Sequence, residues 1–223
     1  MGEIGLYEAM STLRAVRRLR ADPIPEEILA RIMKAASWAP TGGNVQPWRA
    51  IVVRDPERKE RLGEYYLRGW NDYSAGHREQ LANAPEALRT QQEKMLSAGD
   101  YLGAHFGESP AVVIFCFNPK LMAITDARLD RISVVGGASI YTAVENLLLA
   151  CRAEGLGCTL TTLLCGYEDE VRGILEIPEP WGTACAIPIG YPVGGGHGPI
   201  SRRPVEKLAF LDHWGNAFPS PSH

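Results

Sequence analysis

Arginine is concentrated in two short stretches near the ends of the chain. The arginines of these stretches are Arg14, Arg17, Arg18, Arg20, Arg202 and Arg203. A guanidinium group binds carboxylate and phosphate oxygens through paired, charge-assisted hydrogen bonds. A solvated helix face and a basic tail would also place arginine in this way. The two clusters nevertheless favour an anionic ligand, and a phosphate ester held from both ends of the chain is the best candidate.

A loop rich in glycine, hydroxyl and amide groups supplies the second candidate site. It reads Pro40-Thr41-Gly42-Gly43-Asn44-Val45-Gln46-Pro47-Trp48. Two glycines permit close backbone approach, and Thr, Asn and Gln present hydroxyl and amide groups along a short arc. Such groups suit a polyhydroxyl chain or the edge of a heteroaromatic ring. An ordinary turn between a helix and a strand is the alternative.

The common catalytic motifs are absent from the sequence. There is no P-loop, no Gly-x-Gly-x-x-Gly that opens a helix, no nucleophile elbow and no short histidine spacing for a metal. Nothing singles out a carboxylate pair. The run Gly194-Gly195-Gly196-His197-Gly198 is followed by no Lys-Ser/Thr and no helix. We therefore interpret it as a flexible connector rather than a phosphate loop.

Hydrophobic spacing predicts the elements that must position these residues. The residues Leu6, Met10, Leu13 and Val16 follow helical spacing, which places the N-terminal arginines at the end of a first helix. Further helices are predicted over 23–38, 136–154 and 168–175, and strands over 51–53, 111–117, 158–164 and 184–189. The 111–117 run is apolar on both faces, so it should be a central, covered strand. Two helices before the first strand favour an α+β layered domain.

Composition limits the class of protein. The 223 residues carry a formal net charge of −3, which disfavours a polycationic nucleic-acid binder. The longest apolar run, Ala111–Phe117, is too short to span a membrane, and the first residues do not form a signal peptide. The five cysteines form no C-x-x-C pair and are expected to be buried and reduced. We therefore expect a cytoplasmic protein that binds neither membrane nor nucleic acid.

Four segments in register resemble the FMN-dependent nitroreductase family. They are Arg14-Ala15-Val16-Arg17-Arg18-Leu19, the loop Pro40 to Trp48, the run Glu145 to Ala150 that leads into Gly155-Leu156-Gly157-Cys158 and Thr161-Thr162-Leu163, and Arg202-Arg203-Pro204-Val205-Glu206. Together they cover most of the chain. They are specific for the family and not for any substrate.

The resemblance implies a single domain over 1–223 with an α/β/α layered fold, a central, mostly antiparallel sheet and FMN at the interface of an intertwined homodimer. Residues from about 62 to 110 would form a variable cap over the flavin that selects the electron acceptor. Its aromatic residues are Tyr65, Tyr66, Trp70 and Tyr73, which either stack on a planar substrate or merely pack the cap. Residues from about 194 to 223 would form a C-terminal tail that packs on the partner subunit.

The resemblance also implies the cofactor contacts. Arg14, the backbone of Ala15 and Arg17 would hold the phosphate and the N1–O2 edge of the flavin. Leu13 and Ala15 depart from the family pattern, which shifts phosphate binding toward Arg18 or the tail. The other implied contacts are Pro40, Thr41, Gly42, Asn44 and Gln46 from the partner subunit, the backbone of Thr161, Thr162 and Leu163 near N5 and O4, and Arg202 or Arg203 at the phosphate.

The expected activity is FMN-dependent oxidation of NAD(P)H with transfer of electrons to a nitroaromatic or quinone-like acceptor. Flavin supplies the redox chemistry, so the protein need only bind, orient and tune it, which agrees with the missing catalytic motifs. NAD(P)H and the acceptor would visit the flavin in turn, giving ping-pong kinetics. Two alternatives are a same-fold enzyme for dehalogenation or flavin fragmentation, and a flavin-binding storage or sensor protein with little turnover.

Overall fold

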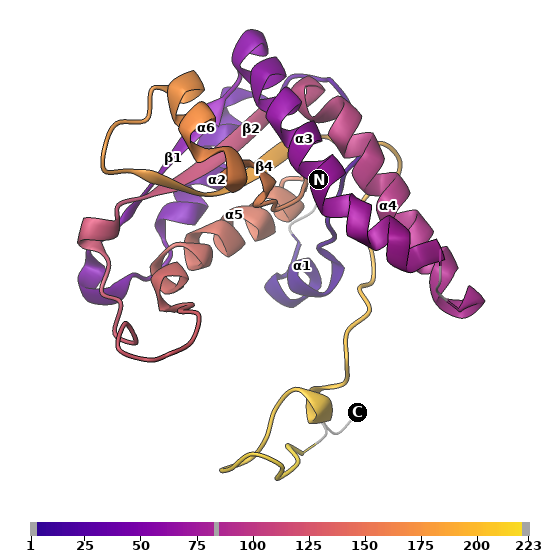
Figure 1. The fold of residues 1–223 in the computed structure, drawn as a ribbon, viewed down its shortest axis with the longest axis vertical. Helices are drawn as coiled ribbons and strands as arrows, with labels where there is room; N and C mark the ends of the chain where they lie inside the picture. The colour runs from indigo at the N-terminus through magenta and orange to yellow at the C-terminus, as the bar shows by residue number, and fades with distance from the viewer. Residues whose placement is uncertain (1–3, 83–84, 220–223) are drawn as a thin grey trace.

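The computed structural model describes residues 4–82 and 85–219, which are built around one antiparallel sheet (Figure 1). Within these ranges the sheet has the strand order β1-β2-β4-β3. Its strands are β1 (Trp48–Val53), β2 (Ala111–Phe117), β3 (Gly157–Cys158) and β4 (Gly182–Gly190). Each neighbouring pair is antiparallel. The prediction of a central strand over 111–117 is therefore confirmed.

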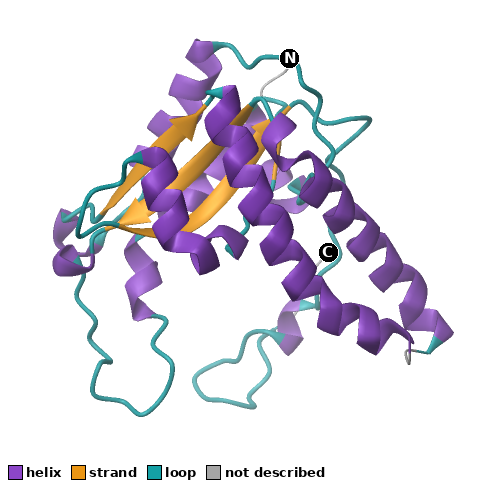
Figure 2. Cartoon of the chain, turned by 45° about the horizontal axis from the view of Figure 1, so that its top comes forward, coloured by secondary structure: helices purple, strands orange, loops and turns teal. Residues whose placement is uncertain are grey.

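Helices cover both faces of the sheet, which gives three layers (Figure 2). They are α1 (Leu6–Thr12), α2 (Glu26–Ser37), α3 (Pro56–Ala82), α4 (Glu86–His105), α5 (Tyr141–Ala153) and α6 (Glu168–Leu175). α2 and α5 pack on one face, whereas α3, α4 and α6 pack on the other. The α+β, α/β/α layered fold is thus confirmed, and α6 has the predicted bounds.

A hydrophobic core lies on each face of the sheet, and β2 contributes side chains to both. Val113 and Phe115 point into the core under α2 and α5, while Val112 and Ile114 point into the core under α3, α4 and α6. All four side chains are fully buried. Successive residues of a strand face opposite sides of its sheet, so a run of apolar residues is what a doubly covered strand requires.

The first helix is shorter than predicted. α1 ends at Thr12, and the residues that follow are extended. We call residues 13–20 the arginine arm. The amide N–H of Val16 donates to the carbonyl of Cys158 at 2.9 Å, and that of Arg20 donates to the carbonyl of Tyr191 at 2.8 Å. These hydrogen bonds to distant strands replace the helical ones, so the arginines lie along the sheet edge and not at a helix end.

Two other predicted elements differ from the structure. The strand expected over 158–164 ends at Cys158; Thr161 then forms an isolated bridge with Ala186, and residues 163–167 form a 3-10 helix. The helix expected from residue 136 begins at Tyr141, after a 3-10 turn over 135–139. Gly136 and Gly137 lie in that turn, and glycine is among the weakest α-helix formers. Among the described residues, no helix is long and apolar enough to cross a bilayer.

The described part of the C-terminal tail runs away from the body of the molecule below α1 (Figure 1). Its end folds back on itself, with a bridge between Phe210 and Ala217 and ring centroids of Phe210 and Trp214 4.7 Å apart. Trp214 is nevertheless 88% exposed, and Leu208 and Phe218 are also exposed. Such an apolar end has too little surface of its own to form a core.

Candidate functional site

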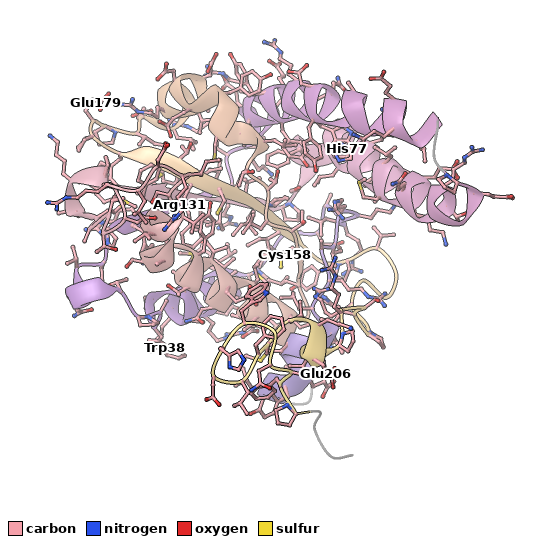
Figure 3. The ribbon with its side chains drawn as sticks, turned by 60° about the horizontal axis from the view of Figure 1, so that its bottom comes forward. Trp38, His77, Arg131, Cys158, Glu179 and Glu206 are labelled. Carbon is pink, nitrogen blue, oxygen red and sulfur yellow. The ribbon has the colours of Figure 1, made fainter. Side chains whose placement is uncertain are left out.

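The arginine arm is placed by its contact with β3. Ala15 forms a parallel bridge with Cys158, whose position is marked in Figure 3. Val16 is buried and packs directly over Gly157, where an added Cβ would lie 2.7 Å from Val16 Cγ1. A side chain at position 157 would therefore collide with Val16, so glycine at this position lets the arm pack against β3.

Arg17 lies at the edge of a hollow between the arm, α3 and the segment after β3. We call this the Arg17 hollow; it has a volume of about 220 Å³ and is lined by Arg17, Tyr66, Trp70, Tyr73 and residues 159–163. It brings together three predicted cofactor residues of one segment, Thr161, Thr162 and Leu163, with Arg17. The backbone of Thr161 is fixed by two hydrogen bonds with Ala186, at 2.9 and 2.8 Å.

Aromatic side chains of α3 form one wall of the Arg17 hollow. Tyr66 is buried, and burial raises the pKa of its hydroxyl, while a hydrogen bond with Thr161 and the charge of Arg17 oppose the rise. The indole N–H of Trp70 donates to Asp100 on α4 at 2.8 Å. Tyr73 is 52% exposed at the rim. Burial and hydrogen bonding therefore hold Tyr66 and Trp70 in place, and Tyr73 is the exposed ring of this wall.

Arg14 lies on the other side of the arm, against the start of the tail. Its Nε donates to the carbonyl of Pro199 at 3.1 Å, and a second guanidinium N–H donates to the same oxygen. The amide of Gly198 donates to the carbonyl of Thr12 at 3.0 Å. The segment 194–198, which the sequence suggested to be a flexible connector, is thus hydrogen-bonded to the end of α1 and to the arm.

The remaining basic candidates lie apart from the Arg17 hollow. The guanidinium of Arg18 stacks 4.1 Å above the ring of Tyr101 on α4, which is a cation–π contact. Arg202 and Arg203 are exposed in the tail, and Arg202 donates to the carbonyl of Ser201 at 2.9 Å. Within residues 4–82 and 85–219, no ion pair joins Arg14, Arg17 or the tail arginines to a carboxylate.

The loop from Pro40 to Gln46 is held at the start of α5 and leaves its polar groups exposed. The amide of Gly42 donates to Ser139 Oγ at 3.1 Å, and that of Gln46 donates to Thr41 Oγ1 at 3.1 Å. Asn44 and Gln46 have φ angles of 55° and 51°. A positive φ is uncommon for residues other than glycine, and such strained positions cluster at ligand sites.

The cysteines carry no chemistry that we can assign. All five are free thiols; Cys116, Cys151, Cys158 and Cys185 are buried, as predicted, whereas Cys165 is only partly buried. Burial raises the pKa of Cys116 to about 11 and that of Cys185 to about 12. Because the thiolate is the nucleophile, these thiols are inert near neutral pH.

Two polar residues beside Arg14 were not predicted from the sequence. The Nε of Arg152, in the last turn of α5, donates to Thr12 Oγ1 at 2.9 Å. His197 contacts both the arginine arm and Leu156, the residue before β3. No local pattern marks either residue, since each contact joins segments more than 40 residues apart.

Comparisons with known proteins show which family the chain resembles. The model of the nitroreductase family matches residues 12–191. A relative from Thermus thermophilus named NADH dehydrogenase is 33% identical over 203 residues, which is 87% of this chain and 90% of the relative.

Two solved structures share the fold at low sequence identity. An NADPH:FMN oxidoreductase from Vibrio harveyi in complex with NAD+ is 16% identical, with a TM-score of 0.67 over 96% of this chain and 79% of that one. An iodotyrosine deiodinase bound to FMN and 3-iodo-L-tyrosine is 22% identical, with a TM-score of 0.65 over 96% of this chain and 100% of that one. From its sequence and its fold, the chain belongs to the nitroreductase family and is an oxidoreductase.

Proposed function

We propose that the Arg17 hollow and the adjacent face of Arg14 bind FMN, and that the protein oxidises NAD(P)H and reduces a nitroaromatic or quinone-like acceptor. The observation that carries this proposal is a pair of arginines, Arg14 and Arg17, that form no ion pair with a carboxylate of the described residues. They lie on either side of an arm that borders a wall of aromatic rings. When bound, FMN accepts hydride from NAD(P)H and passes electrons to the acceptor. FMN-bound and NADPH:FMN relatives of the same fold support the assignment.

The donor groups fit both ends of this cofactor. A guanidinium has five N–H donors, and Arg14 uses two of them on Pro199, which leaves three for a phosphate. We assign the phosphate to Arg14, the amide of Ala15 and one of Arg202 and Arg203, with Arg18 as a further contact if it leaves Tyr101. Arg17 takes the N1–O2 edge of the ring, and the backbone of residues 161–163 faces N5 and O4.

A homodimer would complete the site. The Arg17 hollow, at about 220 Å³, is smaller than the roughly 300–1,000 Å³ of most ligand pockets, so a flavin needs a further wall. We assign that wall to the exposed loop of the partner, through its residues Pro40, Thr41, Gly42, Asn44 and Gln46.

Apolar surface outside the site also supports a dimer. α1, α2 and α5 leave a second hollow of about 340 Å³, which is lined by apolar residues that include Leu6 and Trp38. Both side chains are more than half exposed, and Trp38 lies at the surface in Figure 3. Exposed apolar surface of this kind marks interaction sites. The C-terminal tail, with its exposed Trp214, is our candidate for a segment that packs on the partner.

The long α3–α4 pair projects beyond the sheet and is our candidate for the acceptor-selecting cap (Figure 2). Tyr73, half exposed at the rim of the Arg17 hollow, is placed to contact an acceptor. Reductive dehalogenation is the second candidate activity, because a deiodinase bound to FMN shares the fold over 96% of this chain.

Initial-rate kinetics with NAD(P)H and a quinone test the proposed activity. We expect parallel double-reciprocal plots, because donor and acceptor occupy the same face of the flavin in turn. Replacing the quinone with a halogenated phenol tests the second candidate under the same conditions. Intersecting plots would contradict alternate occupation of one site, and an FMN-loaded protein that NAD(P)H does not reduce would favour a storage or sensor role.

A further inference from the structure

His197 connects three segments that are far apart in the sequence. Its Nε2 lies 2.9 Å from the carbonyl oxygen of Leu156, directly before β3. Its Nδ1 lies 3.4 Å from the backbone nitrogen of Arg14 in the arginine arm. The ring itself belongs to the start of the C-terminal tail, after β4. One side chain therefore joins the segment between α5 and β3, the arm and the start of the tail.

The partners of His197 define its protonation state. A carbonyl oxygen can only accept, so Nε2 carries a proton and donates to Leu156. An amide N–H can only donate, so Nδ1 must be bare to accept from Arg14. Both contacts are made only by the neutral ring with its proton on Nε2.

The segment around His197 also fixes the Arg14 side chain. Arg14 donates to the carbonyl of Pro199, and a Cβ added to Gly198 would lie 3.3 Å from Arg14 Cζ. The amide of Ile200 donates to the carbonyl of Ser11 at 3.3 Å. The backbone of Arg14 is thus held by the His197 ring, and its guanidinium is held by the residues that follow the ring.

We propose that His197 is a positioning residue for Arg14: its neutral ring holds the Arg14 amide and so aims the guanidinium at the phosphate of FMN. The inference rests on the proposed function, because it assumes that Arg14 contacts that phosphate. It assigns His197 no contact with the cofactor. The ring acts through the backbone and the carbonyl of Pro199.

The surroundings of the ring give this arrangement a pH dependence. Burial lowers the pKa of His197 from its ordinary value of 6.5, and the charges of Arg152 on α5 and Arg14 on the arm lower it further. The hydrogen bond to Leu156 opposes this shift. The neutral ring is therefore maintained near neutral pH. As the pH falls through the lowered pKa, Nδ1 gains a proton and can no longer accept from Arg14.

Two substitutions separate this role from simple packing. His197→Phe keeps a ring but removes both hydrogen bonds, and His197→Asn keeps an acceptor oxygen for the Arg14 amide and cannot titrate. We expect the dissociation constant of FMN to rise about 5- to 30-fold in His197→Phe and to stay within about threefold in His197→Asn. Riboflavin, which lacks the phosphate, should change by less than about twofold in both.

A pH series distinguishes the proposed role from a purely structural one, because a structural role would not make the affinity for FMN depend on the protonation of His197. We compare the FMN-to-riboflavin affinity ratio of the wild type and His197→Asn between about pH 7.5 and about pH 5, on either side of the ordinary histidine pKa. Protonation of the phosphate affects both proteins equally. A difference between their affinity ratios therefore reports the loss of the neutral His197 ring in the wild type. We expect the ratio to fall further in the wild type. A ratio that falls equally in both, or that rises in the wild type because the imidazolium attracts phosphate, would overturn the proposal.

The binding of both flavins to His197→Phe also tests the proposal. Equal weakening of FMN and riboflavin in His197→Phe would assign the ring to folding and overturn the proposal, as would unchanged binding of both. If His197→Phe does not fold, the tautomer of the wild-type ring is measured by 15N NMR; a proton on Nδ1 at neutral pH would overturn the proposal. A wild-type protein that binds FMN no better than riboflavin would overturn the phosphate assignment itself, whereas a failure confined to the variants overturns only the role of His197.

Discussion

Alanine in place of Arg14 is expected to weaken FMN binding by about 10- to 150-fold and to leave riboflavin binding nearly unchanged. A charge-assisted hydrogen bond contributes about 1.5–3 kcal/mol, which corresponds to this range of affinity. The guanidinium has no carboxylate partner among the described residues, so its removal leaves no orphaned acid behind. Fluorescence titration of FMN and riboflavin measures both constants.

Arg20 offers a matched control for Arg14. It belongs to the same arm but pairs with Asp22 at 3.2 Å at the surface, so Arg20→Ala should leave both affinities within about twofold. The double variant of Arg202 and Arg203 to alanine should reproduce the FMN-specific loss if the tail closes on the phosphate. Equal weakening of both flavins would mean that the tail arginines act through folding or dimerisation, and no weakening would leave them as a solvated basic tail.

Replacement of Arg17 with methionine is expected to slow reduction of bound FMN by NAD(P)H by about 100- to 1,000-fold. A fixed cation at the edge of the ring where negative charge develops stabilises that charge, and loss of one such donor has an effect of this size. Methionine is unbranched and apolar, so it keeps the stem that lines the Arg17 hollow. Anaerobic stopped-flow absorbance measures the rate.

Arg17→Lys is the matched variant, because it keeps the positive charge and loses the planar guanidinium group. It should retain most of the rate that Arg17→Met loses. The reduction potential of the bound flavin should fall in the methionine variant and change little in the lysine variant. If the reduction potential and the reduction rate are both unchanged in Arg17→Met, Arg17 does not contact the edge of the flavin ring.

The sequence predicted the elements that depend on local signals. The apolar run over 111–117 identified the covered central strand, and the acidic start at Glu168 identified α6. The sequence did not predict the arginine arm. Leu6, Met10, Leu13 and Val16 follow helical spacing, so the pattern gives no sign that the helix ends at Thr12. The partners that decide the conformation, Cys158 and Tyr191, are more than 140 residues away.

The candidate site was predictable in part for the same reason. Arg14 and Arg17 could be singled out by their clustering, and the structure places Arg17 with residues 161–163 in one hollow. His197 and Arg152 carry no such signal, since their roles follow from contacts with the arm and with the end of α1 that only the fold creates. The cofactor contacts from the exposed loop and from the tail arginines stay predictions, because the loop would act in a second subunit and Arg202 and Arg203 do not line the Arg17 hollow.

Anaerobic reduction of the purified protein, after it is loaded with FMN, tests the proposed function most directly. We expect a yellow protein that binds one FMN per chain and whose visible flavin absorbance is bleached by NADH or NADPH, then restored by a quinone or nitroaromatic acceptor. A correctly folded protein that takes up no FMN, or whose bound FMN neither nicotinamide bleaches, would contradict it.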